Sequence, residues 1–162
     1  MQDFTLLMDK GMRNLSSKGA FLTVKGNDGV NTMTISWGFV GFMWAKPHFI
    51  TVVRPQRFTE QILRAADSFT VSIPFDGQLK EELAVCGTQS GRDIDKSSVV
   101  RFIPAKTVAS PVVAGCGLYY ECKIDLRQQF DGSCMLPEIA RQFYKDDFHF
   151  MYFGEITDCY EI

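Results

Sequence analysis

Strict alternation of apolar and polar residues in "LYYECKIDLR", residues 118–127, constrains the fold most. Successive side chains of a β-strand point to opposite faces, so a period of two separates a core face from a water-facing one. Such a half-solvated strand is typical of an antiparallel sheet. The predicted core face holds Leu118, Tyr120, Cys122, Ile124 and Leu126, and the predicted outer face holds Tyr119, Glu121, Lys123, Asp125 and Arg127.

Strand patterns also occur over residues 20–26, 31–42, 47–54, 67–74 and 148–158. Asparagine and glycine in "GNDG" favour a tight turn, so the first two of these segments are predicted to form a hairpin. The third is nearly all apolar, as expected of a strand covered on both faces.

Helical patterns are few and short, over residues 57–67, 76–87 and 137–147. Thr59 is a candidate N-cap of the first helix, and Gly87 is a candidate terminator of the second. Many strands joined by a few short helices predict a mainly β fold, an antiparallel barrel with flanking helices.

The 162 residues fit a single domain that spans residues 1–162. A formal net charge of −2 gives no indication of nucleic-acid binding, which favours a basic face. No segment approaches the roughly 20 consecutive apolar residues of a membrane span. The N-terminus lacks the pattern of a signal peptide, so we expect a cytoplasmic protein that does not bind a membrane.

Cysteine and histidine give no basis for a metal site. The five cysteines are an odd number without a C-x-x-C pair, which predicts neither a disulfide framework nor a zinc site. Of the two histidines, His149 lies among aromatic residues and is interpreted as structural. The segment over residues 128–148, which contains Cys134, matches no pattern from which a role follows.

The stretch "NTMTISWG", which begins at Asn31, combines strand periodicity with a hydroxyl-bearing face. Thr34 and Ser36 lie on one face, about 6–7 Å apart along the strand. The Asn31 amide can both donate and accept hydrogen bonds. Either water or a ligand can satisfy these groups. If a ligand does, Met33 and Ile35 on the other face would lie in the core.

The stretch "VVRPQRFT" places Arg54 and Arg57 directly before a predicted helix start at Thr59. Free backbone N–H groups and the helix dipole favour an anion at such a point. The forked donors of arginine match phosphate oxygens. These residues are therefore candidates for a phosphate site. The alternative is that either arginine pairs with a surface carboxylate, which would contribute little.

The stretch "CGTQSGRDIDKSSV", residues 86–99, is a polar loop interrupted by glycine. A loop of this length is either mobile or shaped around a ligand. Ser90, Gly91 and Lys96 are the candidate ligand contacts in it. The alternative for Lys96, which follows alternating charges, is an exposed and solvated side chain.

The chain contains four motifs in this order: "NTMTISW", "W-x-KPHFITVVRPQRFT", "CGTQSGRDIDK" and "YFGEITD". Together they resemble the flavin reductase-like family, the FMN-binding split barrels that include flavoredoxin. The resemblance runs from about residue 15 to the C-terminus. It implies a six-stranded antiparallel split β-barrel that forms a homodimer and holds FMN non-covalently near the subunit interface.

The resemblance also implies roles for the candidate residues. The strand that begins at Asn31 would run beside the flavin, the arginine turn would bind the 5′-phosphate, and Lys96 would stabilise negative charge on the reduced ring. Trp37 and Trp44 would border the flavin or belong to the core or the dimer interface. The implied cofactor-binding set is Asn31, Met33, Thr34, Ile35, Ser36, Trp37, Val53, Arg54, Arg57, Thr59, Ser90, Gly91 and Lys96.

The resemblance further implies an oxidoreductase in which FMN carries the chemistry and no side chain acts as acid or base. Hydride would come from NAD(P)H and pass to a flavin, metal or protein acceptor. The chain has no G-x-G-x-x-G fingerprint, so a nicotinamide cofactor would bind only transiently. Two alternatives remain: an electron carrier of the flavoredoxin type, reduced by a redox-protein partner, and a non-catalytic barrel that binds another phosphorylated ligand or serves in assembly.

Overall fold

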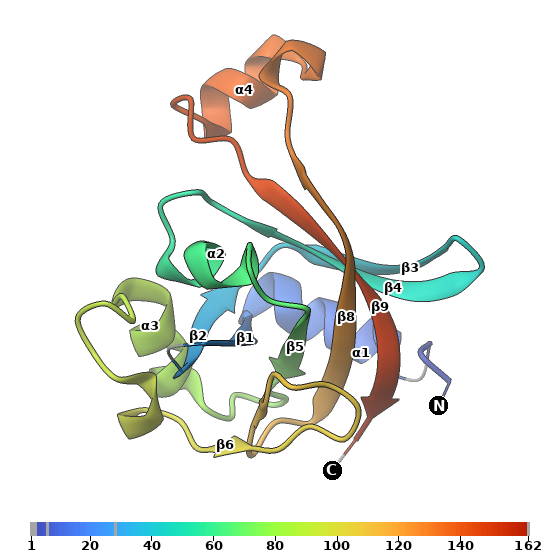
Figure 1. Cartoon of the computed structure of the whole chain (residues 1–162), viewed down its shortest axis with the longest axis vertical. Coiled ribbons are helices and arrows are strands. Elements are labelled where there is room, and N and C mark those ends of the chain that lie inside the picture. Colours follow the sequence, from blue (N-terminus) through green and yellow to red (C-terminus); the bar gives the residue numbers. More distant parts are fainter. Residues whose placement is uncertain (1–2, 6, 28, 162) are drawn as a thin grey trace.

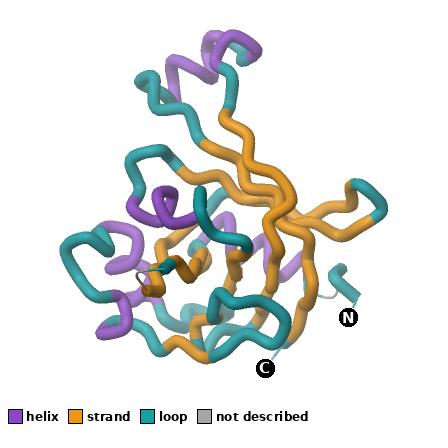
Figure 2. Tube along the Cα trace, viewed as in Figure 1, coloured by secondary structure: helices purple, strands orange, loops and turns teal. Residues whose placement is uncertain are grey.

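The computed structural model describes residues 3–5, 7–27 and 29–161 (Figure 1, Figure 2). The strands are β1 (Ala20–Gly26), β2 (Gly29–Ile35), β3 (Gly38–Met43), β4 (Lys46–Val53), β5 (Ser68–Ile73), β6 (Phe102–Ile103), β7 (Val112–Val113), β8 (Leu118–Gln129) and β9 (Phe150–Tyr160). The helices are α1 (Met8–Ser17), α2 (Phe58–Leu63), α3 (Lys80–Thr88) and α4 (Pro137–Phe143), with 3-10 turns η1 (Lys96–Ser98) and η2 (Gly132–Cys134). Among the described helices, none is long and apolar enough to cross a membrane.

Seven strands form one antiparallel sheet in the order β2-β1-β5-β8-β9-β4-β3, and β6 pairs with β7 separately. β2 and β3 are consecutive in the chain but lie at opposite edges of the sheet. The sheet must therefore curl until its edges are within reach of the short connection at Ser36 and Trp37, as in a split barrel. The predicted mainly β architecture with flanking helices is confirmed, with seven strands in the main sheet where six were predicted.

The prediction of one continuous strand over residues 31–42 is wrong. The chain leaves β1 after Ile35 and pairs with β4 from Gly38 onward. At Gly38 the backbone approaches β4 so closely that an added Cβ would lie 3.0 Å from the carbonyl oxygen of Ile50. Apolar residues continue from β2 into β3, so the sequence pattern does not reveal that the chain changes its partner strand from β1 to β4. Asp28, in the predicted turn before β2, lies outside the described residues.

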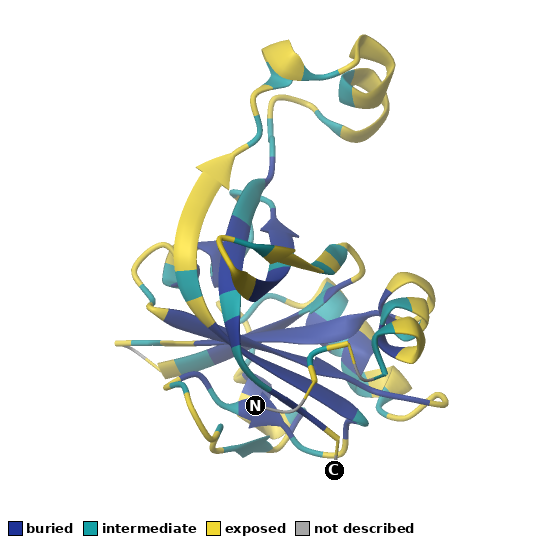
Figure 3. Cartoon of the chain, turned by 90° about the vertical axis from the view of Figure 1, so that its right-hand side faces the viewer, coloured by how far each residue is buried: buried dark blue, intermediate teal, exposed yellow. Residues whose placement is uncertain are grey.

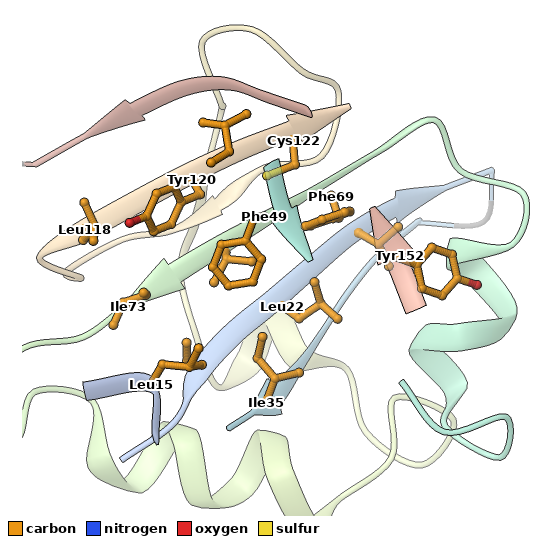
Figure 4. Close-up of a cluster of buried hydrophobic side chains, with 14 of the residues drawn as sticks. Leu15, Leu22, Ile35, Phe49, Phe69, Ile73, Leu118, Tyr120, Cys122 and Tyr152 are labelled. Carbon is orange, nitrogen blue, oxygen red and sulfur yellow. The ribbon is translucent and has the colours of Figure 1, made fainter. Parts of the chain in front are cut away.

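The main core lies inside the curled sheet, where side chains of β1, β4, β5 and β8 point towards one another (Figure 4). The ring of Phe49 lies 5.3 Å from that of Tyr120, and both are fully buried. A second cluster forms where α3 and the chain from Val99 onward cover the other face of the sheet. For this reason Tyr119 and Glu121, which were predicted to face water, are buried.

The three predicted helices are present, but their ends differ from the prediction. α2 begins at Phe58, so Thr59 is not its N-cap residue. α3 begins at Lys80 and contains Gly87, which therefore does not end it. α1 had no predicted counterpart, and it packs Leu15 into the main core.

β8 and β9 continue beyond the barrel as an arm, residues 126–150, that carries η2 and α4 at its tip (Figure 1). Most residues of the arm are exposed (Figure 3). The arm contains the segment over residues 128–148 that no sequence pattern explains. Its base returns to the barrel beside β4, through the pairing of β9 with that strand.

Candidate functional site

Three cavities lie along β2 and share lining residues. The arginine cavity, of about 190 Å³, lies between β2, the turn before α2 and the end of α3, and is named for Arg57 and Arg92. The strand cavity, of about 260 Å³, follows the chain from Met33 in β2 to Trp37 in the connection to β3. The outer cavity, of about 850 Å³, lies between β2, α2 and residues 91–97. Met33 and Arg57 line both the arginine and the strand cavity, so these two cavities are neighbours.

Two buried side chains hold β2 against α2 at the wall of the arginine cavity. The amide nitrogen of Asn31 donates a 2.8 Å hydrogen bond to Thr59 Oγ1, and both residues are almost fully buried. Gly91 packs on the same amide so closely that an added Cβ would lie 2.1 Å from Asn31 Oδ1. The loop after α3 therefore reaches β2 by an approach that only glycine permits.

Arg57 is the cation that the arginine and strand cavities share. Both of its Nη atoms donate to the carbonyl oxygen of Gly87 at 3.3 Å, which holds the guanidinium between α2 and α3. Burial lowers the pKa of Arg57, but arginine remains charged at neutral pH. Among the described residues, no carboxylate forms an ion pair with it. A partly buried cation without a counter-charge favours an anionic ligand.

Arg92 brings a second guanidinium to the arginine cavity and also lines the outer cavity. The guanidinium lies 5.1 Å from the centre of the Phe58 ring and donates to the carbonyl oxygen of Gln56 at 3.4 Å. Ser90 Oγ accepts a 3.1 Å hydrogen bond from the backbone N–H of Arg92, which shapes the turn. The sequence prediction left out Arg92, although it directly follows Gly91 in the "SGRDIDK" stretch.

Aromatic side chains from the arm close one side of the strand cavity. The ring of Trp37 lies 5.2 Å from that of His149 and meets Phe143 edge-on at 5.7 Å. His149 Nδ1 lies 3.0 Å from the hydroxyl oxygen of Tyr144. Burial, with a smaller effect from the charge of Arg54, lowers the pKa of His149 to about 4, so its imidazole is neutral at pH 7. The structural interpretation of His149 missed its place in this wall.

Comparison with known proteins covers nearly the whole chain. The family model described as "Flavin reductase like domain" matches residues 12–162. The chain belongs to the flavin reductase-like family. No curated protein is significantly similar in sequence.

Solved structures of flavin reductase-like proteins and related flavoproteins share the fold. An FMN-binding protein from Thermus thermophilus is 24% identical with a TM-score of 0.71, over 89% of this chain and 71% of that one. Flavoredoxin from Methanosarcina acetivorans is 21% identical with a TM-score of 0.70, over 90% and 68% of the two chains. An NADH:FAD oxidoreductase from Streptomyces globisporus is 20% identical with a TM-score of 0.68, over 90% and 76%.

The motifs of the flavin reductase-like family predicted that Arg54 binds phosphate together with Arg57. In the structure, the side chain of Arg54 instead contacts the arm. Arg54 forms an ion pair with Asp147 and donates to the carbonyl oxygen of Phe143 at 2.7 Å. Arg54 lines the strand cavity but not the arginine cavity. Arg54 therefore has the carboxylate partner of the alternative interpretation, and the second guanidinium at the arginine cavity is that of Arg92.

Thr34 and Ser36 both line the strand cavity, but the Thr34 hydroxyl is left only as an acceptor for a ligand, since its proton is already donated. Thr34 Oγ1 donates a 2.6 Å hydrogen bond to the carbonyl oxygen of Leu83 in α3. Ser36 is exposed. Met33 and Ile35 are buried in the main core, as predicted, and both also line the strand cavity. The register predicted for β2 is therefore confirmed.

The motifs of the family predicted that Lys96 contacts a flavin ring, but Lys96 does not line the strand cavity. It is 2% exposed, and its ammonium donates to the carbonyl oxygens of Gln89 at 2.5 Å and Val85 at 3.5 Å. A cation at this point stabilises the C-terminal end of α3. Val53, another predicted contact, is 1% exposed in the main core and lines none of the three cavities.

Proposed function

We propose that this chain binds FMN non-covalently and acts as a flavin reductase-like oxidoreductase that takes hydride from NAD(P)H. The observation that carries the proposal is that Met33 and Arg57 line both the arginine cavity and the strand cavity, which are therefore neighbours. One end holds Arg57 without a carboxylate partner in the described chain, and the other is a slot along β2 with aromatic walls. FMN has the matching form, with a phosphate at one end and a flat ring at the other.

The residues present fit FMN by type. Arg57 and Arg92 would hold the phosphate, since guanidinium donors match phosphate oxygens. β2 is an edge strand, so its outward backbone N–H and C=O groups have no strand partner and would hydrogen-bond the ring. Trp37 and His149 would exclude water from one side. When bound, FMN supplies the capacity to accept hydride or electrons, which the protein's side chains lack.

The protein's own contribution is binding and orientation. His149 is neutral at pH 7 because burial lowers its pKa, so it adds no charge to the strand cavity. Arg54 lines that cavity with its charge largely balanced by Asp147. Neither group needs to transfer a proton for hydride to reach a flavin.

We also propose a homodimer, supported by the hairpin of β3 and β4. β3 is an edge strand of the sheet. Phe39, Phe42 and Trp44 of this hairpin are 51%, 67% and 57% exposed. Large aromatic side chains gathered at an unpaired edge are typical of a protein interface. Light scattering should give the mass of two chains, and a monomer at micromolar concentration would contradict the proposal.

The visible spectrum of the purified protein, with the released cofactor identified, tests flavin binding. Anaerobic mixing with NADH and with NADPH then tests the reductase activity, and at least one should bleach the flavin. A protein that holds flavin but is bleached by neither would instead be an electron carrier that a protein partner reduces. A protein that stays colourless after incubation with FMN would contradict flavin binding altogether.

A further inference from the structure

The arm tip, residues 130–149, packs on itself beyond the end of the barrel (Figure 1). The rings of Phe130 and Phe148 lie 6.4 and 4.9 Å from the ring of Tyr144. The backbone N–H of Phe130 donates to the carbonyl oxygen of His149 at 2.9 Å. Neither of the two short helices described in the arm tip, η2 and α4, contains a buried residue. The arm tip is therefore a unit of its own, carried by β8 and β9.

Hydrogen bonds join the arm tip to the barrel directly after β4. The guanidinium of Arg54 pairs with the carboxylate of Asp147 and donates to the carbonyl oxygen of Phe143 at 2.7 Å. The side-chain amide of Gln56 donates to the same carboxylate at 3.2 Å. In the part of the chain that the structure describes, every other hydrogen bond of the arm tip lies within the arm. Arg54 therefore makes the main polar connection between the arm tip and the barrel.

The carboxylate of Asp147 is also held from within the arm. The backbone N–H of Lys145 donates to Asp147 Oδ1 at 2.9 Å. This hydrogen bond and, after it, the one from Arg54 lower the pKa of Asp147. The carboxylate is therefore charged at neutral pH, where the ion pair with Arg54 is complete.

This connection keeps aromatic groups of the arm tip at the strand cavity. Phe143 and His149 pack against Trp37, whose side chain is still 44% exposed. Arg54, Trp37 and His149 all line the strand cavity. The pair of Arg54 and Asp147 thus holds the arm tip where it covers one side of that cavity.

We propose that Arg54 and Asp147 form a latch that holds the arm tip over the strand cavity and so restricts the electron acceptor to small, flat molecules. The inference rests on the proposed function, because the strand cavity would hold the flavin ring. A protein acceptor has to bring its own redox centre close to that ring, and the arm tip stands in its way. Opening of the latch would let the arm tip move on β8 and β9 and admit the larger acceptor.

The test breaks the latch from both sides. Arg54→Met removes the guanidinium, and Asp147→Asn removes the negative charge but keeps an oxygen for the N–H of Lys145. These two latch variants change the net charge in opposite directions, so an effect that both share does not come from charge. Asp146→Asn is the matched control, because Asp146 is exposed and forms no ion pair in the described chain.

The exposure of Trp37 reports the position of the arm tip without any flavin. The chain has two tryptophans, so Trp44→Phe in every variant leaves Trp37 as the single emitter. Quenching of its fluorescence by acrylamide, which is uncharged, measures how far solvent reaches the ring. Exposure can rise from 44% towards completeness, so quenching should rise by up to about twofold in both latch variants. Asp146→Asn should keep the parent value.

The choice of acceptor is measured on FMN-loaded protein that has been reduced anaerobically. A small naphthoquinone takes two electrons and two protons from one reduced flavin, whereas two molecules of ferric cytochrome c take one electron each and the protons pass to solvent. The ratio of the second-order rate constants, cytochrome c over naphthoquinone, should rise about tenfold in Arg54→Met, the effect of one lost hydrogen bond to a charged group. It should rise less in Asp147→Asn, which keeps the hydrogen bond from Arg54 to Phe143.

The two measurements separate this inference from the proposed function. If the protein binds no flavin, a rise in Trp37 quenching in both latch variants would still support the latch, although the proposed function would fail. The inference is overturned if the latch variants match Asp146→Asn in quenching. It is also overturned if quenching rises while the ratio of rate constants stays at the parent value. In both of these cases flavin binding by all variants would leave the proposed function intact.

Discussion

Replacement of Arg57 by alanine should weaken FMN binding far more than replacement of Arg54. Arg57 lines both the arginine and the strand cavity and has no carboxylate partner in the described chain. A hydrogen bond to a charged group contributes about 1.5–3 kcal/mol. Loss of one such bond to the phosphate therefore predicts a rise in Kd of roughly 10- to 150-fold.

Arg54→Ala removes a different kind of interaction. Arg54 and Asp147 have side chains that are 28% and 27% exposed, and ion pairs near the surface contribute at most about 1 kcal/mol. The Kd of FMN should therefore change by less than about threefold, since Arg54 does not line the arginine cavity, the proposed phosphate site. Arg101→Ala, at an exposed arginine outside the three cavities, controls for the loss of one positive charge.

Fluorescence titration of the flavin-free variants at one ionic strength measures these effects, with riboflavin as a ligand that lacks the phosphate. Arg57→Ala should lower the affinity for FMN and leave the affinity for riboflavin nearly unchanged. The assignment of Arg57 to the phosphate is refuted if its variant binds FMN as tightly as the parent does. It is also refuted if the affinity for riboflavin falls by the same factor.

Three further predictions follow from buried or crowded groups. Burial gives His149 in the folded protein a pKa of about 4, against 6.5 for a free histidine. Its contribution to the free energy of unfolding is therefore complete above pH 6.5 and falls by up to about 3 kcal/mol as the pH drops towards 4. Urea unfolding should show a smaller pH dependence in His149→Gln than in the parent. Glu60 is fully buried and pairs with two arginines, so Glu60→Gln should lower the free energy of unfolding by about 3 kcal/mol. Asp9→Asn, which breaks an exposed ion pair, should change the free energy of unfolding by less than about 1 kcal/mol. Gly91→Ala would place its Cβ 2.1 Å from the buried asparagine of β2 and should weaken FMN binding, while Gly41→Ala, with nothing within 4 Å, should not.

The strands were predictable because a period of two records directly which residues a sheet buries. The pattern fails where a second layer covers the sheet, as at Tyr119 and Glu121, because residues far along the chain supply that layer. It fails again between β2 and β3, since apolar residues continue while the chain moves from one edge of the sheet to the other.

Residues of the candidate site could be predicted only where a local sequence motif itself forms the wall of a cavity. Arg57 and Gly91 stand in local motifs and line the arginine cavity, where their contact with a ligand stays a prediction. The partner of Arg54 could not be found from a local motif, because Asp147 is 93 residues away in the sequence. The partners of Lys96 could not be found either, because they are backbone carbonyl oxygens, which any sequence can supply.

The arm shows why the least interpretable segment bears directly on the candidate site. Phe143 and His149 come from the arm and pack against Trp37 at the strand cavity, while the ion pair of Arg54 and Asp147 fastens the arm to the end of β4. The groups that would hold phosphate lie in the turn before α2 and in the loop after α3, and none of them belongs to the arm. In the proposed complex, separate parts of the chain would therefore control the affinity for the phosphate and the access to the strand cavity, which would hold the ring. If the chain binds FMN as proposed, changes in the sequence of the arm should alter which electron donor or acceptor reaches the strand cavity and leave the affinity for the phosphate unchanged.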